Sequence, residues 1–215
     1  MSKFLGKIHY WLFNKICWFE GLEGEIVSVM AGEGINTEEI INNIYNKYGA
    51  PLPNVPLEQQ IDQNNIHGWL QEKIWMSEGR MAALTKAFMD CDKEALKKLA
   101  SIYESQGMKA AEEVKNNGGA YGAPEQLFGR VNDYILDGMP CDRVNEIIGN
   151  DENAVTWIRT QCVHSAVWEK ENCSADTFYS LRDIWIKTFI EGLNPDFEYV
   201  HFENGKMTIR RRGDN

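Results

Sequence analysis

Two segments of the chain repeat the same pattern of potentially reactive residues. IHYWLFNKICWFEG at positions 8–21 and IHGWLQEKIWMSEG at 66–79 align without a gap and keep a histidine and a glutamate in both copies. Imidazole nitrogens and carboxylate oxygens bind metal ions and also transfer protons in acid–base catalysis. The repeated pairs are His9 with Glu20 and His67 with Glu78.

Helix geometry sets how these pairs can meet. Eleven residues span roughly 16 Å along a helix, so His9 cannot reach Glu20 within one helix. If the two repeat helices pack antiparallel, His9 comes level with Glu78 and His67 with Glu20. We therefore predict crossed histidine–glutamate pairs across a helix interface. Such pairs either fasten the interface or form a metal or acid–base site.

A second set of candidate ligands lies toward the C-terminus, in PCDRV at 140–144 and CVHSAVWEKENC at 162–173. Thiolate and imidazole together suit zinc, iron or an iron–sulfur cluster. A single reactive cysteine, with His164 or His67 as its base, is an equally open interpretation, and buried inert cysteines are the structural alternative. The candidate residues are Cys141, Cys162, His164 and Cys173. Cys162 and His164 are also the candidate catalytic residues.

The apolar spacing predicts a mainly α protein. Helices are expected over about 4–30, 37–48, 57–89, 92–114, 124–137, 151–170 and 174–193, with a short one after Pro140. Two β-prone runs around Asn204-Gly205 predict a terminal hairpin over 196–212. YGAP occurs at 48–51 and again at 121–124. We therefore expect one domain in which duplicated helical pairs, at about 4–51 and 62–124, pack about a pseudo-twofold axis, followed by helices over 140–193.

Composition narrows the class of protein. The 215 residues carry a formal net charge of −10 and are 43% hydrophobic. This balance excludes a phosphate-backbone binder, so no nucleic-acid partner is expected. No apolar run approaches the roughly 20 residues that cross a bilayer, and no signal-peptide core is apparent. Five widely spaced cysteines fit reduced thiols, so we expect a cytoplasmic protein without a membrane partner, with a small-molecule ligand or a homodimer left open.

The C-terminal third resembles a known family. CVHSAVWEKENCSADTFYSLRDIW followed by NPDFEYVHFENGKMTIRRR is similar to the C-terminal part of helical proteins related to L-2-amino-thiazoline-4-carboxylate hydrolase. The resemblance covers about the last 75 residues, and Cys162 and Cys173 are the positions that match. It implies a small-molecule pocket among helices, with hydrolytic or metal-dependent chemistry.

Three functions follow as hypotheses. The first is a helical protein that binds zinc, iron or a metallo-cofactor through the histidine, cysteine and glutamate side chains named above. The second is a hydrolase of small thiol-derived heterocycles or amides that uses a cysteine nucleophile or a metal-bound water. The third is a non-enzymatic ligand-binding or oligomerisation module.

Overall fold

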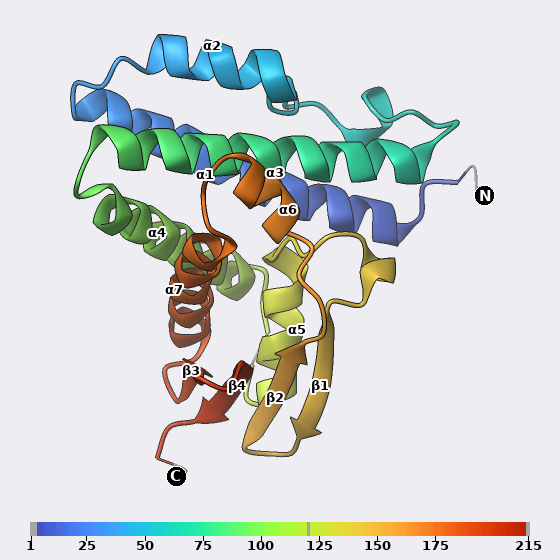
Figure 1. The fold of residues 1–215 in the computed structure, drawn as a ribbon. Helices are drawn as coiled ribbons and strands as arrows, with labels where there is room; N and C mark the ends of the chain where they lie inside the picture. Colours follow the sequence, from blue (N-terminus) through green and yellow to red (C-terminus); the bar gives the residue numbers. More distant parts are fainter. Residues whose placement is uncertain (1–3, 120, 214–215) are drawn as a thin grey trace.

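A computed structural model describes residues 4–119 and 121–213 of the chain (Figure 1). It confirms the mainly α class: the described residues form seven α-helices, two short 3-10 helices and one four-stranded sheet. The α-helices are α1 (Lys7–Gly32), α2 (Thr37–Tyr48), α3 (Ile66–Cys91), α4 (Ala95–Asn116), α5 (Pro124–Tyr134), α6 (Ser165–Lys170) and α7 (Ala175–Leu193). The strands are β1 (Asn145–Asn150), β2 (Ala154–Arg159), β3 (Phe197–His201) and β4 (Lys206–Arg211), and the 3-10 helices are η1 (Leu57–Gln59) and η2 (Pro140–Asp142).

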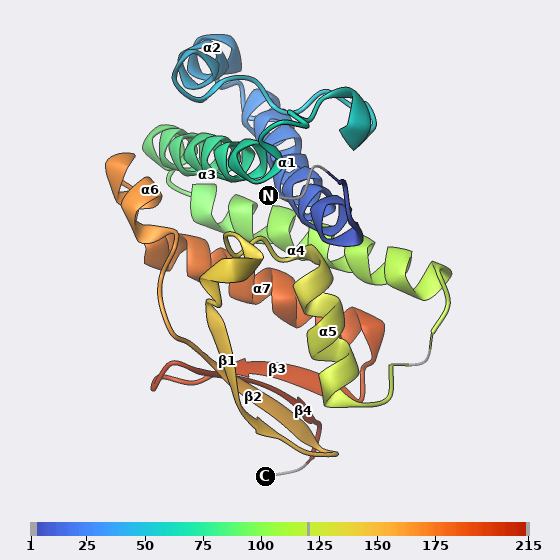
Figure 2. The same cartoon turned by 90° about the vertical axis from the view of Figure 1, so that its right-hand side faces the viewer.

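The two repeat helices, α1 and α3, lie side by side and run in the same direction (Figures 1 and 2). Their first turns meet at His9 and His67. Farther along both helices, Arg80 of α3 pairs with Glu20 and Glu23 of α1. α2, which connects them in the chain, runs in the opposite direction and packs mainly on α3. The predicted antiparallel packing of the repeats is therefore wrong. The chain reverses direction twice, once into α2 and once into α3, so α3 runs parallel to α1.

The predicted duplication of helical pairs is not evident in the packing. α2 stays on α3, whereas α4, which follows the second copy, packs chiefly against α7. Gly107 allows this close approach, since a Cβ atom there would lie 2.7 Å from the backbone oxygen of Trp185. The α4–α7 contact joins the helical layer to the C-terminal part of the chain.

The sheet has the antiparallel order β1-β2-β4-β3. α5 and α7 lie over one of its faces, as Figure 2 shows. The terminal hairpin β3–β4 confirms the prediction around Asn204-Gly205, and Gly205 adopts the left-handed φ of +80° that such a turn favours. The hairpin is not isolated, because β4 also pairs with β2.

The helix predicted over 151–170 is wrong. That range begins with the turn at 151–153 that joins β1 to β2 and continues through β2, and only α6 at its end is helical. Val155 and Trp157 of β2 are buried, while Thr156 between them and Ile158 after them are less so, which is the two-residue period of a strand. The helix predicted over 57–89 also begins later, since residues 57–59 form η1 and α3 starts at Ile66. Within the described ranges, no helix combines the length and the apolar character that a bilayer span requires.

Candidate functional site

Four segments far apart in sequence converge on His164, which precedes α6 and has no solvent-exposed surface. Its Nδ1 lies 3.0 Å from Oε1 of Glu78 on α3. Its Nε2 lies 3.0 Å from Oδ1 of Asp137, in the loop after α5. Nη1 of Arg182 on α7 donates to the same Asp137 oxygen at 2.6 Å. We call these four side chains the His164 cluster.

The charges of the His164 cluster support one another. Burial disfavours the charged imidazolium, but the carboxylates of Glu78 and Asp137 outweigh that cost and raise the pKa of His164 to about 9. Burial likewise disfavours ionised Asp137, yet Arg182 and His164 hold its pKa well below its usual range. His164 is therefore a buried cation at neutral pH, and both of its ring nitrogens face carboxylates. The predicted role of His164 as a base for a cysteine is not supported by this arrangement.

Aromatic side chains enclose the imidazole. The ring centroid of Phe178 lies 4.6 Å from that of His164, and Trp168 packs against Phe178 at 5.0 Å between ring centroids. Both aromatic residues are buried. Low polarity around an ion pair strengthens its attraction and fixes its orientation. The His164 cluster thus anchors the segment 161–165, which contains His164 itself.

Cys162 lies in that segment, and its side chain is exposed. Its Sγ is 3.0 Å from the hydroxyl of Tyr179 and accepts the N–H of Ser165 at 3.3 Å. Partial burial opposes ionisation of this thiol, but the bonds from Tyr179 and from the N–H groups of His164 and Ser165 lower its pKa below its usual value. An accessible thiol with a lowered pKa is the environment typical of a nucleophilic cysteine.

Arg159 completes the surroundings of Cys162. Its guanidinium carbon lies 3.4 Å from the ring centroid of Tyr179, so it stacks on the same side chain that contacts the thiol. Its Nε and Nη2 are screened from solvent and bond to no described residue. The charge of Arg159 therefore acts on Tyr179, where it lowers the pKa of the hydroxyl against the larger effect of burial.

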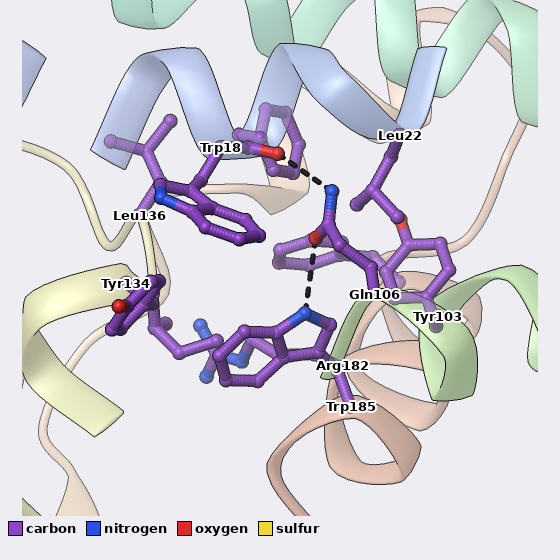
Figure 3. A pocket seen from close by; sticks show the side chains of 11 residues that line it. Trp18, Leu22, Tyr103, Gln106, Tyr134, Leu136, Arg182 and Trp185 are labelled. Atoms are coloured by element: carbon purple, nitrogen blue, oxygen red, sulfur yellow. Dashed lines mark hydrogen bonds between the residues drawn. The ribbon is translucent and has the colours of Figure 1, made fainter. Parts of the chain in front are cut away.

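An aromatic pocket lies on the other side of Arg182 (Figure 3). Gln106 donates to the Trp18 backbone carbonyl oxygen at 2.9 Å and accepts from Nε1 of Trp185 at 3.0 Å, which holds the amide between the α1 backbone and the Trp185 indole. The free space inside this pocket is only about 30 Å³. That is room for one or two waters rather than a larger ligand. The pocket therefore supports the packing of α1, α4 and α7 and is not a substrate site in this conformation.

The repeated histidines contact each other and not the glutamates. Nε2 of His9 lies 3.2 Å from Nε2 of His67. Because the N–H of Gly6 donates to Nδ1 of His9, a neutral His9 ring carries its proton on Nε2 and donates it to His67. This arrangement is a hydrogen-bonded pair at the start of α1 and α3. A metal at both Nε2 atoms would require the Gly6 contact to break.

The repeated glutamates have different partners. Glu20 pairs with Arg80 and accepts the N–H of Leu52 at 2.9 Å, whereas Glu78 faces His164. Arg80 also pairs with Glu23 at 2.9 Å. The crossed pairs predicted from the sequence are therefore wrong, because parallel helices bring each histidine level with the other. We call Arg80, Glu20 and Glu23 the Arg80 cluster.

The remaining candidate ligands are scattered. Cys141 is exposed in η2, and Cys173 is buried between α6 and α7. Within residues 4–119 and 121–213, no three histidine, cysteine, aspartate or glutamate side chains are grouped so that they could hold a metal ion. Metal or metallo-cofactor binding stays a prediction, without a ligand set among these residues.

Sequence reasoning missed three central residues, Asp137, Tyr179 and Arg182. One signal was present for Arg182: it lies four residues after Phe178 and three before Trp185, on the apolar stripe of α7, where an unpaired charge is costly. Asp137 lies in a loop and has no local pattern that predicts its partners.

Comparison with known proteins adds no relative: no family model, no curated protein and no solved structure matches the chain.

Proposed function

We propose that the protein is a thiol-dependent hydrolase of a small amide or thiol-derived heterocycle, with Cys162 as its nucleophile. The observation that carries the proposal is the contact of the exposed Cys162 Sγ with the Tyr179 hydroxyl and the Ser165 N–H. The hydrolytic chemistry implied by the C-terminal resemblance agrees with this assignment. The His164 cluster positions the segment and touches no substrate.

The chemistry needs two steps. The thiolate of Cys162 bonds to the electrophilic carbon of the substrate, and the carbon–nitrogen or carbon–sulfur bond to the leaving group breaks as that group takes a proton from water. Hydroxide from the same water then attacks that carbon in the covalent intermediate, a thioester from an amide or an isothiourea from an amino-thiazoline. The carbon–sulfur bond to Cys162 breaks, which releases a carboxylic acid from the amide or a carbamoyl compound from the heterocycle and restores the Cys162 thiolate. Burial and the bond to Cys162 raise the pKa of Tyr179 above its usual value, so its hydroxyl stays protonated and can donate to developing negative charge.

Alkylation with iodoacetamide tests the nucleophile without a known substrate. Cys162 is expected to react at least about tenfold faster than Cys17, because thiolate is the reactive form. Cys17 is the matched control: it is also exposed, but burial of its sulfur and the charge of Glu20 raise its pKa to about 11. Peptide mapping by mass spectrometry measures both rates. Equal rates at Cys162 and Cys17 would overturn the assignment.

Turnover of L-2-amino-thiazoline-4-carboxylate and of simple amides tests the reaction class. Cys162→Ser is expected to lose at least about a thousandfold in rate, while Cys141→Ser, at another exposed thiol, keeps it. A Cys162→Ser protein as active as its parent contradicts the proposal. Elemental analysis of the same protein, purified without oxygen, tests the metal-binding hypothesis, which a stoichiometric metal would favour.

A further inference from the structure

Asp137 also lines a second pocket, between α1 and the segment 137–145. Its free space is about 160 Å³, several times that of the aromatic pocket. We call it the Lys15 pocket; the lining residues that matter below are Trp11, Lys15, Asp137, Met139, Arg143 and Val144.

Lys15 is only 5% exposed, although lysine is rarely buried without a partner. Its ammonium lies 3.8 Å from the ring centroid of Trp11, and among the described residues no carboxylate or hydrogen-bond acceptor pairs with it. Trp11 is itself held by a 3.0 Å bond from Nε1 to Asp133. Among the described residues, the Lys15 ammonium is therefore held by an aromatic face and by the more distant charges of Asp137 and Asp133, without an ion pair or hydrogen bond of its own.

Asp137 acts on Lys15 through its charge, but its oxygens are already bonded to other groups. Its Oδ1 accepts from His164 and Arg182, and its Oδ2 accepts from Asn145 at 2.8 Å. Its charge is therefore already compensated by two cations. The pocket keeps an excess of positive charge in a chain whose net charge is −10.

Arg143 supplies a second cation at the same pocket. Its side chain is exposed and pairs with no carboxylate among the described residues. Its φ of +51° is a left-handed conformation that non-glycine residues seldom adopt. Such local backbone strain persists where the surrounding structure imposes it and is concentrated at ligand sites. Met139 and Val144, both buried, form an apolar wall beside the two cations.

We propose that the Lys15 pocket binds a small carboxylate with a short apolar chain. The carboxylate would lie between Lys15 and Arg143, where an arginine fork and an ammonium both donate to oxygen. The apolar chain would lie against Met139 and Val144. This site does not depend on the thiol chemistry proposed for Cys162.

Calorimetric titration with butyrate at matched ionic strength tests the site. Butyrate is expected to bind saturably with one site per chain, and butyramide, its neutral counterpart, at least about tenfold more weakly. Lys15→Met is expected to weaken butyrate binding by about tenfold or more, whereas Lys187→Met, at an exposed lysine of α7, leaves it unchanged. Arg143→Gln is expected to weaken it about two- to fivefold.

Several results would overturn the proposal. No saturable binding to the parent protein, equal affinity for butyrate and butyramide, or full binding by Lys15→Met each does so. If Lys15→Met does not fold, Arg143→Gln decides, since unchanged affinity in that variant is incompatible with the site. Cys162→Ser should bind butyrate as the parent does, so failure of the thiol hydrolase proposal leaves this test intact.

Discussion

The Arg80 cluster and the His164 cluster use the same kinds of side chain with different balances of charge. In the first, one cation faces two buried carboxylates, and burial, with Glu20 adding to it against the pull of Arg80, raises the pKa of Glu23 to about 7. In the second, two cations share two carboxylates, and the further cations Lys15 and Arg159 lie beside them.

The surroundings differ as well. The Arg80 cluster joins α1 to α3 and contains no nucleophile. The His164 cluster joins α3, α7 and two loops, and it lies next to an exposed thiol and a pocket with an unpaired lysine. Buried ion pairs alone therefore do not locate function in this molecule. We therefore locate the candidate site where unpaired cations and accessible space occur together.

The largest effect is expected from Arg80→Met, which leaves Glu20 and Glu23 buried without their cation. Breaking a buried ion pair by removing one partner costs about 3–5 kcal/mol. Urea denaturation at pH 7 measures the loss. Arg130→Met, at an exposed arginine paired with Asp133, is the control and should cost less than about 1 kcal/mol.

A second variant separates charge from packing at this site. Arg80→Met combined with Glu23→Gln should recover part of the loss, because glutamine carries no charge to strand. A loss below about 1 kcal/mol for Arg80→Met alone would mean that the cluster is not held by its ion pairs.

The His164 cluster should make stability depend on pH in the neutral to basic range. The folded pKa of His164 is raised from 6.5 to about 9, so the folded protein binds this proton more tightly than the unfolded chain does. The stabilisation is fully present below pH 6.5 and is lost as the pH rises to about 9. Its upper bound is about 3 kcal/mol.

Titration of the His164 ring by NMR is the direct measurement, because other groups titrate in the same window. Asp137→Asn should move the midpoint toward lower pH, since it removes one of the two facing carboxylates. A midpoint near the ordinary value for histidine would show that the imidazole is not held as a cation.

Lys15 should act in the opposite direction. Burial, opposed by Asp137 and Asp133 and reinforced by Arg182, lowers its pKa from 10.5 to about 8. A depressed lysine pKa contributes stability above pH 10.5, and this contribution is lost as the pH falls through about 8. Without a bound anion, Lys15→Met is therefore expected to stabilise the protein at pH 7 by about 1–3 kcal/mol, less what the Trp11 contact contributed.

The gain should shrink as the pH approaches 10.5, which denaturation over a pH series measures. Lys187→Met, at an exposed position of α7, should show no such trend. A loss of stability in Lys15→Met that is the same at every pH would mean that the ammonium is satisfied in the folded protein.

The elements of this fold could be predicted from the sequence only where their signals are local. Apolar spacing was enough for α1, α2, α4 and α7, and Asn204-Gly205 was enough for the terminal hairpin, because these signals are local. β1 and β2 were missed because short runs such as Ile147-Ile148 fit either a strand or a helix turn. The direction of α3 relative to α1 depends on the path of α2 and the loop after it, which no residue spacing encodes.

The candidate site was predictable only in part. Cys162 and His164 were recognised by residue type, and Glu78 by its repeat. Their partners come from a loop and from α7, which tertiary packing brings together. Lys15 lies inside the first repeat copy, where its apolar neighbours indicate burial, but its lack of a partner is visible only in the fold.

The smallest and most discriminating effect compares Glu20→Gln with Glu78→Gln, the equivalent positions of the two repeats. Glu20→Gln removes charge from a cluster with excess carboxylate, so it should cost at most about 1 kcal/mol and lower the pKa of Glu23. Glu78→Gln removes charge from a cluster that needs it, so it should cost about 1 kcal/mol more and lower the pKa of His164. Urea denaturation at pH 7, with NMR titration of Glu23 and His164, measures both pairs of effects. A larger cost at Glu20 than at Glu78 would contradict this difference in charge balance, and with it the reason for locating the candidate site at the His164 cluster.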